Sequence, residues 1–344
     1  MRGAVVRARS RRGGGIQFLA RDSGDRRRGP GGRSPHGREC RGRRRGAAGG
    51  ELRPRVRERH LVDPVSRGIA PKGTVLRVRA LQLGRRRAHD RLRLVARVTL
   101  DGVPASELAR RWGVPQCALF RSLDSALNAV HELGSQGAPA ASLVIAEEQT
   151  AGRGRDGRTW HSPLGGVWLG LLIRPSRAEL GVLSVRVGLA VADAVDGLLG
   201  RAETRLKWPN DVLLGERKLA GILCEGRWHG DAVQWVGLGV GVNVSNPIPR
   251  EVARGAVALD EWLPAVRRLD LLDRLIPALA ALGSSAPTLS ERECAAFAAR
   301  DWLLGRQLRA PAAGRAQGLR PDGALLVDLG AGTIALREGH VVLA

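Results

Sequence analysis

Positive charge is distributed so unevenly along this chain that only part of it can build an ordinary hydrophobic core. Residues 1–100 hold 29 basic and 7 acidic side chains, whereas residues 101–344 hold 27 and 26, so almost the whole net charge of +23 belongs to the first segment. That segment alternates arginine runs with glycine runs and has few large apolar residues to offset the entropy of an ordered chain. We therefore expect residues 1–100 to form a disordered leader.

Three interpretations of the leader remain open. A basic arm could bind phosphates, but Phe18 is the only aromatic residue before Trp112, so bases would find almost no stacking partners. An organelle transit peptide is also Arg-rich, yet seven acidic residues and the lack of an amphipathic period argue against it. We favour a translated GC-rich upstream stretch, with a true start at a codon other than Met because Met1 is the only methionine.

The rest of the chain is long enough for one substantial domain and one small one. No stretch reaches the roughly 18 apolar residues of a membrane span, and no apolar segment follows Met1 as in a signal peptide. Cys40, Cys117, Cys224 and Cys294 stand far apart, so neither a disulfide framework nor a zinc site is indicated. We expect a cytoplasmic protein without membrane attachment or a dedicated metal site.

A short helical lead-in is predicted over residues 101–118, where Ser106 could cap a helix that ends before Gly113. The pattern resembles the first helix and turn of a helix-turn-helix, whose second helix would enter a DNA groove. Pro115 and the short stretch to Phe120 leave little room for that second helix. DNA binding by this element is therefore not expected.

From residue 122 onward the pattern becomes α/β. A helix is predicted over 125–134 and a long one around the apolar stripe of 183–198, which reads as core. Strands are predicted at 142–150, 167–174, 205–207, 219–228 and 232–244, each closed by turn residues.

The loop between the first two strands contains the spacing G-x-G-x-x-G at Gly152, Gly154 and Gly157. A dinucleotide site would need a helix directly behind those glycines and an acidic residue about 20 positions on. Another strand follows instead, so the dinucleotide interpretation fails. Three arginines alternate with these glycines, and exposed backbone N–H groups could approach an anion beside them. A solvated loop is the simpler interpretation in so Arg-rich a chain.

Lysine and asparagine are scarce in this chain, which has three lysines among its 56 basic residues and four asparagines. Lys207, Lys218, Asn210 and Asn243 nevertheless fall within one short region. Because nearly every other cation is arginine, a retained lysine suggests a site that needs a compact ammonium rather than a planar fork. This region is therefore where chemistry is expected.

Four segments, taken in order, resemble the successive motifs of the biotin protein ligase family. They are Gln149-Thr-Ala-Gly-Arg-Gly-Arg-Asp-Gly-Arg-Thr-Trp160, Lys207-Trp-Pro-Asn-Asp211, Arg217-Lys-Leu-Ala-Gly-Ile-Leu223 and Gly237-Leu-Gly-Val-Gly-Val-Asn243. The resemblance implies an α/β (α+β) catalytic domain with a mixed sheet over 119–304, followed by a small SH3-like β-barrel over 305–344. A Pro321-Asp-Gly323 turn suits such a barrel.

The resemblance also implies a two-step reaction. Biotin and ATP, with Mg²⁺ on the nucleotide, give biotinyl-5′-adenylate and pyrophosphate, and the acyl group then passes to a lysine of a biotin carboxyl carrier protein. The first step joins two anions, so cations must already surround them: Arg153 and Arg155 as forks, and Lys218 as a point charge. Asp211 is a candidate base for the attacking amine, although a turn-forming Asp explains it equally well.

Individual contacts follow from the same resemblance. The biotin contacts correspond to Ser125, Gln149, Arg153, Gly154, Arg155 and Lys218, and the nucleotide contacts to Trp160, Lys207, Asn210 and Asn243. Ala126 stands where the family has Thr, and the lost hydroxyl is expected to weaken biotin binding by about 1 to 3 kcal/mol. We expect Trp208 and Trp235 to fill core, and Cys224 to be a buried, inert thiol rather than a nucleophile.

Two alternative functions remain. A lipoate or octanoate ligase or transferase would share the fold and a motif lysine, but the glycine and arginine pattern of residues 152–158 resembles the biotin branch. A DNA-binding, biotin-responsive repressor would need the leader or the lead-in to fold on DNA, so nucleic acid is not an expected partner. The resemblance also allows a homodimer.

Overall fold

The computed structural model describes residues 98–177 and 179–344. The predicted leader, as far as residue 97, lies outside the described residues. The described part opens with a short hairpin of β1 (Thr99–Leu100) and β2 (Val103–Pro104). Leu100 is buried, and the Asp101 carboxylate accepts a hydrogen bond from Arg268 at 2.7 Å. The leader boundary predicted at residue 100 thus falls inside this hairpin.

Helix α2 (Ala105–Trp112) follows the hairpin directly. Pro104 precedes its first residue, so Ser106 lies in the first turn and is not the cap; Gly113, at φ +66°, ends the helix as predicted. The Trp112 indole N–H donates to Asp273 at 2.8 Å, which fastens α2 to the main fold. The chain then enters strand β3 rather than a second helix, so this element is not a helix-turn-helix.

A seven-stranded mixed sheet forms the centre of the main fold, as predicted. Its strands run in the order β3-β4-β5-β9-β8-β7-β6, with β3 and β4 parallel and all other neighbours antiparallel. The strands are β3 (Cys117–Leu123), β4 (Leu143–Gln149), β5 (Val167–Ile173), β6 (Thr204–Lys207), β7 (Asp211–Leu214), β8 (Arg217–His229) and β9 (Ala232–Val242).

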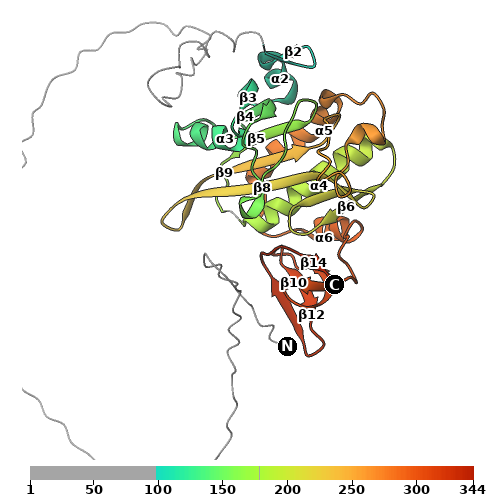
Figure 1. Cartoon of the computed structure of the whole chain (residues 1–344). Coiled ribbons are helices and arrows are strands. Elements are labelled where there is room, and N and C mark those ends of the chain that lie inside the picture. The colour runs from blue at the N-terminus through green and yellow to red at the C-terminus, as the bar shows by residue number, and fades with distance from the viewer. Residues whose placement is uncertain (1–97, 178) are drawn as a thin grey trace, which may run out of the picture. The chain divides into compact units, whose positions relative to one another are not determined.

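Helices cover both faces of this sheet (Figure 1). Helices α4 (Leu180–Leu199) and α5 (Arg268–Ala280) pack on one face, and α3 (Ala126–Ser135) packs on the other. Successive strand residues alternate between the faces: in β4, Leu143 joins the core under α4 and α5, whereas Val144 packs with Val130 of α3. The stripe of 183–198 is therefore core, as predicted.

Strand β9 separates its two faces by residue type. Its valines and leucine point into the core under α4, whereas Gly237, Gly239 and Gly241 point to the other face. A Cβ added at Gly239 would lie 3.2 Å from Leu127 of α3, and one at Gly241 would lie 2.7 Å from Cε2 of Trp160. The missing side chains therefore create the room that α3 and the Trp160 ring occupy.

Several elements lie outside the predicted pattern: the β1–β2 hairpin, the edge strand β3, the strand β7, and the helices α5 and α6 (Glu291–Ala298). Helix α5 contains Pro277, a residue that usually argues against a helix interior. Helix α6 is short, and its start is marked by a capping box in which Ser290 and Glu293 bind each other's backbone. None of the described helices combines the length and apolar composition needed to cross a membrane.

The chain ends in a separate five-stranded antiparallel sheet, in the order β13-β12-β11-β10-β14. Its strands are β10 (Gln307–Ala310), β11 (Gly314–Leu319), β12 (Leu325–Asp328), β13 (Thr333–Leu336) and β14 (Val342–Leu343). The predicted turn at 321–323 joins β11 to β12, with Gly323 at φ +77°. The buried Trp208 indole N–H donates to Gly323 O at 2.9 Å, so this turn is held against the main fold.

Asp301, just before this C-terminal sheet, carries a buried carboxyl group. Its Oδ1 accepts from Leu303 N at 2.8 Å, but its Oδ2 finds no hydrogen-bond donor among the described residues. Burial raises the pKa of Asp301 to about 6. A carboxyl that binds its proton more tightly when folded stabilises least at high pH, so its contribution to stability falls as pH rises from about 4 to about 6.

Asp301→Asn is therefore expected to stabilise the protein at pH 8, where the carboxylate penalty is complete, by about 1 to 3 kcal/mol, and to change stability little at about pH 3.5, where the group is protonated when folded and mostly protonated when unfolded. The amide oxygen can still accept from Leu303. Urea unfolding at both pH values would measure the difference, with Asp231→Asn in the exposed turn between β8 and β9 as control. Equal effects at the two pH values would contradict the assigned role of burial.

Candidate functional site

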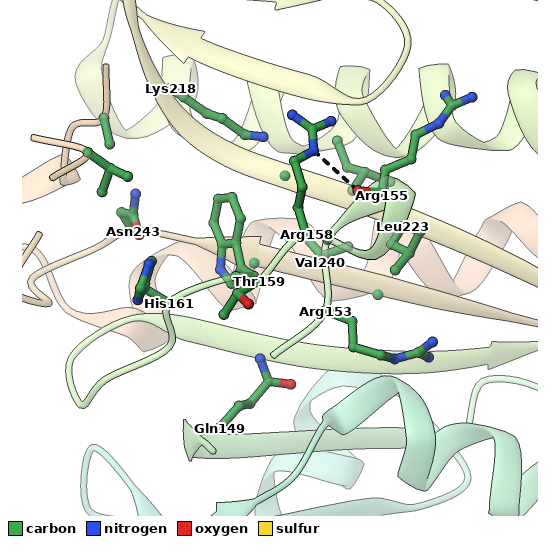
Figure 2. A pocket seen from close by; sticks show the side chains of 18 of the residues that line it. Gln149, Arg153, Arg155, Arg158, Thr159, His161, Lys218, Leu223, Val240 and Asn243 are labelled. Carbon is green, nitrogen blue, oxygen red and sulfur yellow. Dashed lines mark hydrogen bonds between the residues drawn. The ribbon is translucent and has the colours of Figure 1, made fainter. Parts of the chain in front are cut away.

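A cavity of about 470 Å³ opens on the glycine-bearing face of the seven-stranded sheet. Strands β8 and β9 form its floor, and the N-terminus of α3, the loop of residues 152–161 and the loop of residues 246–256 form its walls (Figure 2). The predicted site residues that line it are Ser125, Gln149, Arg153, Gly154, Arg155, Trp160, Asn210, Lys218 and Asn243. Ala126, Lys207 and Asp211 do not line it.

The glycine and arginine loop closes on itself like a small hairpin. Trp160 N donates to Gly152 O at 2.9 Å, and Gly154 N donates to Arg158 O at 2.7 Å. Asp156 and Gly157, both at positive φ, make the reversal between the two arms. Position 152 requires glycine because the two arms of the loop lie close together there: a Cβ would lie 2.7 Å from Ser162 Oγ. Hydrogen bonds and turn geometry therefore hold this loop in a defined conformation along the wall of the cavity.

The three arginines of this loop have different partners. The Arg153 guanidinium forms a two-pronged pair with Glu225 of β8, at 2.8 and 3.1 Å, and it extends away from Lys218 and Asn243 (Figure 2). Arg155 and Arg158 form weaker ion pairs with Asp156, at 3.8 and 3.7 Å, and Arg158 Nε also donates to Arg155 O at 3.2 Å. Arg155 and Arg158 are therefore the loop cations with the most charge left to bind an anion.

Lys218 lies at the start of β8 and reaches into the cavity. Its Nζ is 2.6 Å from Asp211 Oδ1 and 5.1 Å from the centre of the Trp160 ring. The Trp160 ring packs edge-on to Trp168, with centroids 6.5 Å apart. A compact ammonium is thus held between a carboxylate and an aromatic ring, both of which attract a cation.

Ser125 and Gln149, two of the residues predicted to bind biotin, line the cavity near the N-terminus of α3. The Gln149 side chain bridges two elements: its Oε1 accepts from Ala126 N at 2.8 Å, and its Nε2 donates to Ser162 Oγ at 2.8 Å. Ser125 precedes the first residue of α3, and its hydroxyl does not cap that helix. The Ala126 methyl is buried in the apolar cluster with Val130, so the effect of the missing Thr hydroxyl stays a prediction.

Asparagines lie on the side of the cavity that is predicted to bind the nucleotide. Asn210 Nδ2 donates to Ile222 O at 2.9 Å, which ties the motif turn to β8. Buried Asn243 accepts from Asn246 Nδ2 at 3.2 Å, and Asn246 Oδ1 in turn accepts from Val244 N at 3.1 Å. Asn246 also lines the cavity but was not a predicted site residue. The scarcity of asparagine that marked the other two would have identified it as well.

Lys207 lies beside the cavity and faces the junction with the C-terminal sheet. Its Nζ is 5.2 Å from the centre of the Trp302 ring, and Arg306 covers the same ring at 4.0 Å. Burial lowers the pKa of Lys207, an effect that Asp211 opposes and Lys218 reinforces. A role for Lys207 in nucleotide binding stays a prediction.

Two of the described cysteines, Cys117 and Cys224, have thiols that burial makes hard to ionise. Burial raises the pKa of Cys224 to about 12 and that of Cys117 to about 12, so both stay protonated at neutral pH. Trp208 is buried as predicted, and partly buried Trp235 packs on the cluster under α3.

Other cavity residues carried no motif signal in the sequence. They are Leu127, His161, Leu169, Ile248, Pro249, Glu251, Val252, Gly255 and Ala256. Several belong to the loop of 246–256, whose place over the cavity depends on pairing with β8: Lys218 N donates to Gly255 O at 2.8 Å. No pattern within a short stretch of sequence predicts such a contact between distant segments.

Comparison with known proteins points to one group. A family model described as the biotin/lipoate A/B protein ligase family matches residues 119–243. The bifunctional ligase/repressor BirA of Bacillus subtilis is 39% identical over 145 residues, which are 40% of this chain and 44% of the relative. The biotin–[acetyl-CoA-carboxylase] ligase of Mycobacterium tuberculosis is 37% identical over 214 residues, which are 58% of this chain and 78% of the relative.

Solved structures give the same result. The biotin protein ligase of Aquifex aeolicus in complex with biotin and ATP superposes with a TM-score of 0.56 at 26% identity, over 67% of this chain and 99% of that chain. The match to the Bacillus relative spans less than half of that protein's length, whereas the match to the Aquifex protein spans nearly all of it.

Proposed function

We propose that this chain, which belongs to the biotin protein ligase family, activates biotin with ATP and transfers it to a lysine of a biotin carboxyl carrier protein. The M. tuberculosis relative, named a biotin–[acetyl-CoA-carboxylase] ligase, and the Aquifex ligase, solved with biotin and ATP, support both substrates. The observation that carries the proposal is the cavity itself: its lining includes three cations, Arg155, Arg158 and Lys218, and its floor on β8 and β9 is largely apolar.

In the first step the biotin carboxylate attacks the α-phosphorus of ATP and pyrophosphate leaves. Both reactants are anionic, so their approach needs positive charge that is already in place. Arg155 and Arg158 supply planar donors to carboxylate and phosphate oxygens. Lys218 supplies a point charge where negative charge shifts from one oxygen to another, and Asp211 and the Trp160 ring hold its ammonium in position.

In the second step the carrier lysine attacks the acyl carbon of biotinyl-5′-adenylate, AMP leaves, and the amine loses a proton. Asp211 is the candidate acceptor of that proton. Its carboxylate is paired with Lys218 at 2.6 Å, so it can accept a proton only after Lys218 has moved onto the substrate oxygens. Asp211 thus has two proposed roles, which are to position Lys218 in the first step and to serve as a base in the second.

Magnesium fits this site only as a companion of the nucleotide. Among the described residues no group of three His, Cys, Asp or Glu side chains is placed to hold a metal. Glu251 is the one carboxylate in the cavity lining. The ion would lie on the phosphates of ATP and neutralise their charge.

The test is mass spectrometry of a purified biotin carboxyl carrier domain after incubation with this protein, ATP and biotin. The expected product carries a single biotinyl group on one lysine. Parallel reactions with lipoate and octanoate on a lipoyl domain test the alternative activity. Modification of the lipoyl domain without modification of the biotin carrier would overturn the proposal.

A repressor function has one observation in its favour, the name ligase/repressor of the Bacillus relative. The match to that relative spans 44% of its length, and in this chain β3 directly follows α2. A mobility shift with DNA over a range of salt concentrations, with and without residues 1–97, would test this candidate.

Deleting residues 1–97 is expected to leave biotin transfer to the carrier within about twofold of the full chain, because the predicted site residues all lie in the described part of the chain. Every cavity residue lies between Ser125 and Ala256, and the fold is described from residue 98. The deletion must stop at residue 97, since a cut at 100 would remove buried Leu100. Steady-state transfer rates of the two proteins would check this, and a large loss in a folded truncated protein would assign the leader a role.

A further inference from the structure

A chain of hydrogen bonds runs behind the glycine and arginine loop and joins four elements around the cavity. The Trp235 indole N–H of β9 donates to His131 Nδ1 of α3 at 3.1 Å. His131 Nε2 lies 3.0 Å from Glu225 Oε2 of β8. Glu225 accepts both prongs of Arg153 in the loop, at 2.8 and 3.1 Å.

The chemistry of these groups sets the direction of every bond. An indole N–H can only donate, so His131 Nδ1 must accept and carries no proton. The ring proton therefore sits on Nε2 and is donated to Glu225. Glu225 is left as an acceptor of three hydrogen bonds, and His131 first and Arg153 next hold the pKa of its carboxyl at about 2. The carboxylate is thus charged throughout the neutral range.

Packing also holds these hydrogen-bonded side chains in place. His131 is 8% exposed, and a Cβ at Gly237 would lie 3.1 Å from its Cε1. The Arg174 guanidinium lies 5.8 Å from the Trp235 ring centre, and it also donates to Gly134 O at the end of α3 at 3.1 Å. The imidazole is therefore held between α3 and β9 with little freedom to turn.

We infer that Glu225, oriented by His131 and Trp235, is a positioning residue that anchors the glycine and arginine loop over the cavity through the side chain of Arg153. Arg153 then acts through Glu225 rather than by binding a substrate anion, in contrast to the role expected from its motif. The substrate anions are left to Arg155 and Arg158. This inference rests on the proposed function for its kinetic consequence, but the anchoring of the loop does not depend on it.

The decisive experiment is a double-mutant cycle on the full chain. Glu225→Gln puts an NH₂ group where an oxygen accepts, facing the donors of Arg153 or His131, so the loop should be released. The expected result is a rise of about tenfold in the KM for biotin with kcat changed less than about threefold, and about the same for Arg153→Ala. The double variant should also show a rise of about tenfold in the KM for biotin, because both changes break the same pair of Arg153 and Glu225.

A rise of about a hundredfold in the KM of the double variant, the product of the two single effects, would overturn the inference. Arg153 would then bind a substrate independently of Glu225. Trp235→Phe, which removes only the indole N–H, should give a smaller change in the same direction. Asp270→Asn, which breaks the exposed pair with Arg267 at 2.6 Å on α5, is the matched control and should leave KM unchanged.

Loop release is also measured without any substrate. Trypsin cuts after arginine, and mass spectrometry can assign cleavage after Arg155 or Arg158 separately from all other sites. Glu225→Gln should speed these two cleavages by about tenfold over the parent, as expected for a loop that opens more often. Unchanged cleavage would overturn the anchoring itself. If the parent protein biotinylates nothing, the proposed function fails, and the cleavage result still decides the anchoring.

Discussion

Replacing Lys218 with alanine is expected to lower the rate of biotin adenylation by about 10²–10³-fold, while biotin binding weakens far less. The ammonium stabilises charge that develops as the carboxylate oxygen bonds to phosphorus, so its effect is largest in the transition state. Pyrophosphate exchange and equilibrium biotin binding, measured on the same preparation, separate the two effects. Arg121→Ala, on an exposed position of β3, is the control.

Lys218→Arg should also lower the rate of biotin adenylation, by at least about tenfold, because the planar guanidinium cannot take the place of a compact point charge. The structure gives the reason: Nζ fits between Asp211 at 2.6 Å and the Trp160 ring at 5.1 Å. Near-normal exchange by the arginine variant would contradict this geometric account. Asp211→Asn should slow exchange if the carboxylate positions Lys218, whereas slow transfer with normal exchange would assign Asp211 to the second step alone.

Gly241→Ala is expected to lower kcat/KM for pyrophosphate exchange by about 10²-fold, as small displacements of a positioning group do. A Cβ at this position overlaps Trp160 Nε1 and would lie 2.7 Å from Cε2 of the same ring. The Trp160 ring would have to leave the strand, and with it the ring face that Lys218 packs against at 5.1 Å.

The fold itself should tolerate this change, because Val240 and Val242, which point into the core, are untouched. Circular dichroism and the urea midpoint should therefore stay close to those of the parent. Gly181→Ala in α4 is the control, since a Cβ there meets nothing within 4 Å. Parental activity in the Gly241 variant would show that Trp160 can move at no cost and that its packing on β9 is not needed.

The order of motifs and the strongest periodicities were readable in the sequence. The helix predicted over 125–134 is α3, and the apolar stripe of 183–198 is the buried face of α4. Both signals are local, because a helix repeats every 3.6 residues and a strand every 2. The alternation of glycine and valine in 237–243 likewise follows from the pleat, although only the structure shows that α3 and Trp160 fill the glycine face.

Elements that depend on distant partners were not readable in the same way. Helix α5 contains Pro277 and is stabilised by packing on α4 and β5. Leu100 looked like part of the leader, yet pairing with Val103 and contact with the core bury it. Local composition carries no information about a contact between residues that are 167 positions apart, such as that between Arg268 and Asp101 at 2.7 Å.

The sequence by itself determined which residues this protein brings to its site: a retained lysine, scarce asparagines and a loop of glycines and arginines, because residue type sets what chemistry a group can do. Only the tertiary structure decided how those groups are used. Arg153 and Arg155 are two residues apart and identical in type, but Arg153 is neutralised by Glu225 at 2.8 Å, whereas Arg155 is not. That difference depends on the strand register that places Glu225 beside the loop, and register is set by the packing of the whole sheet.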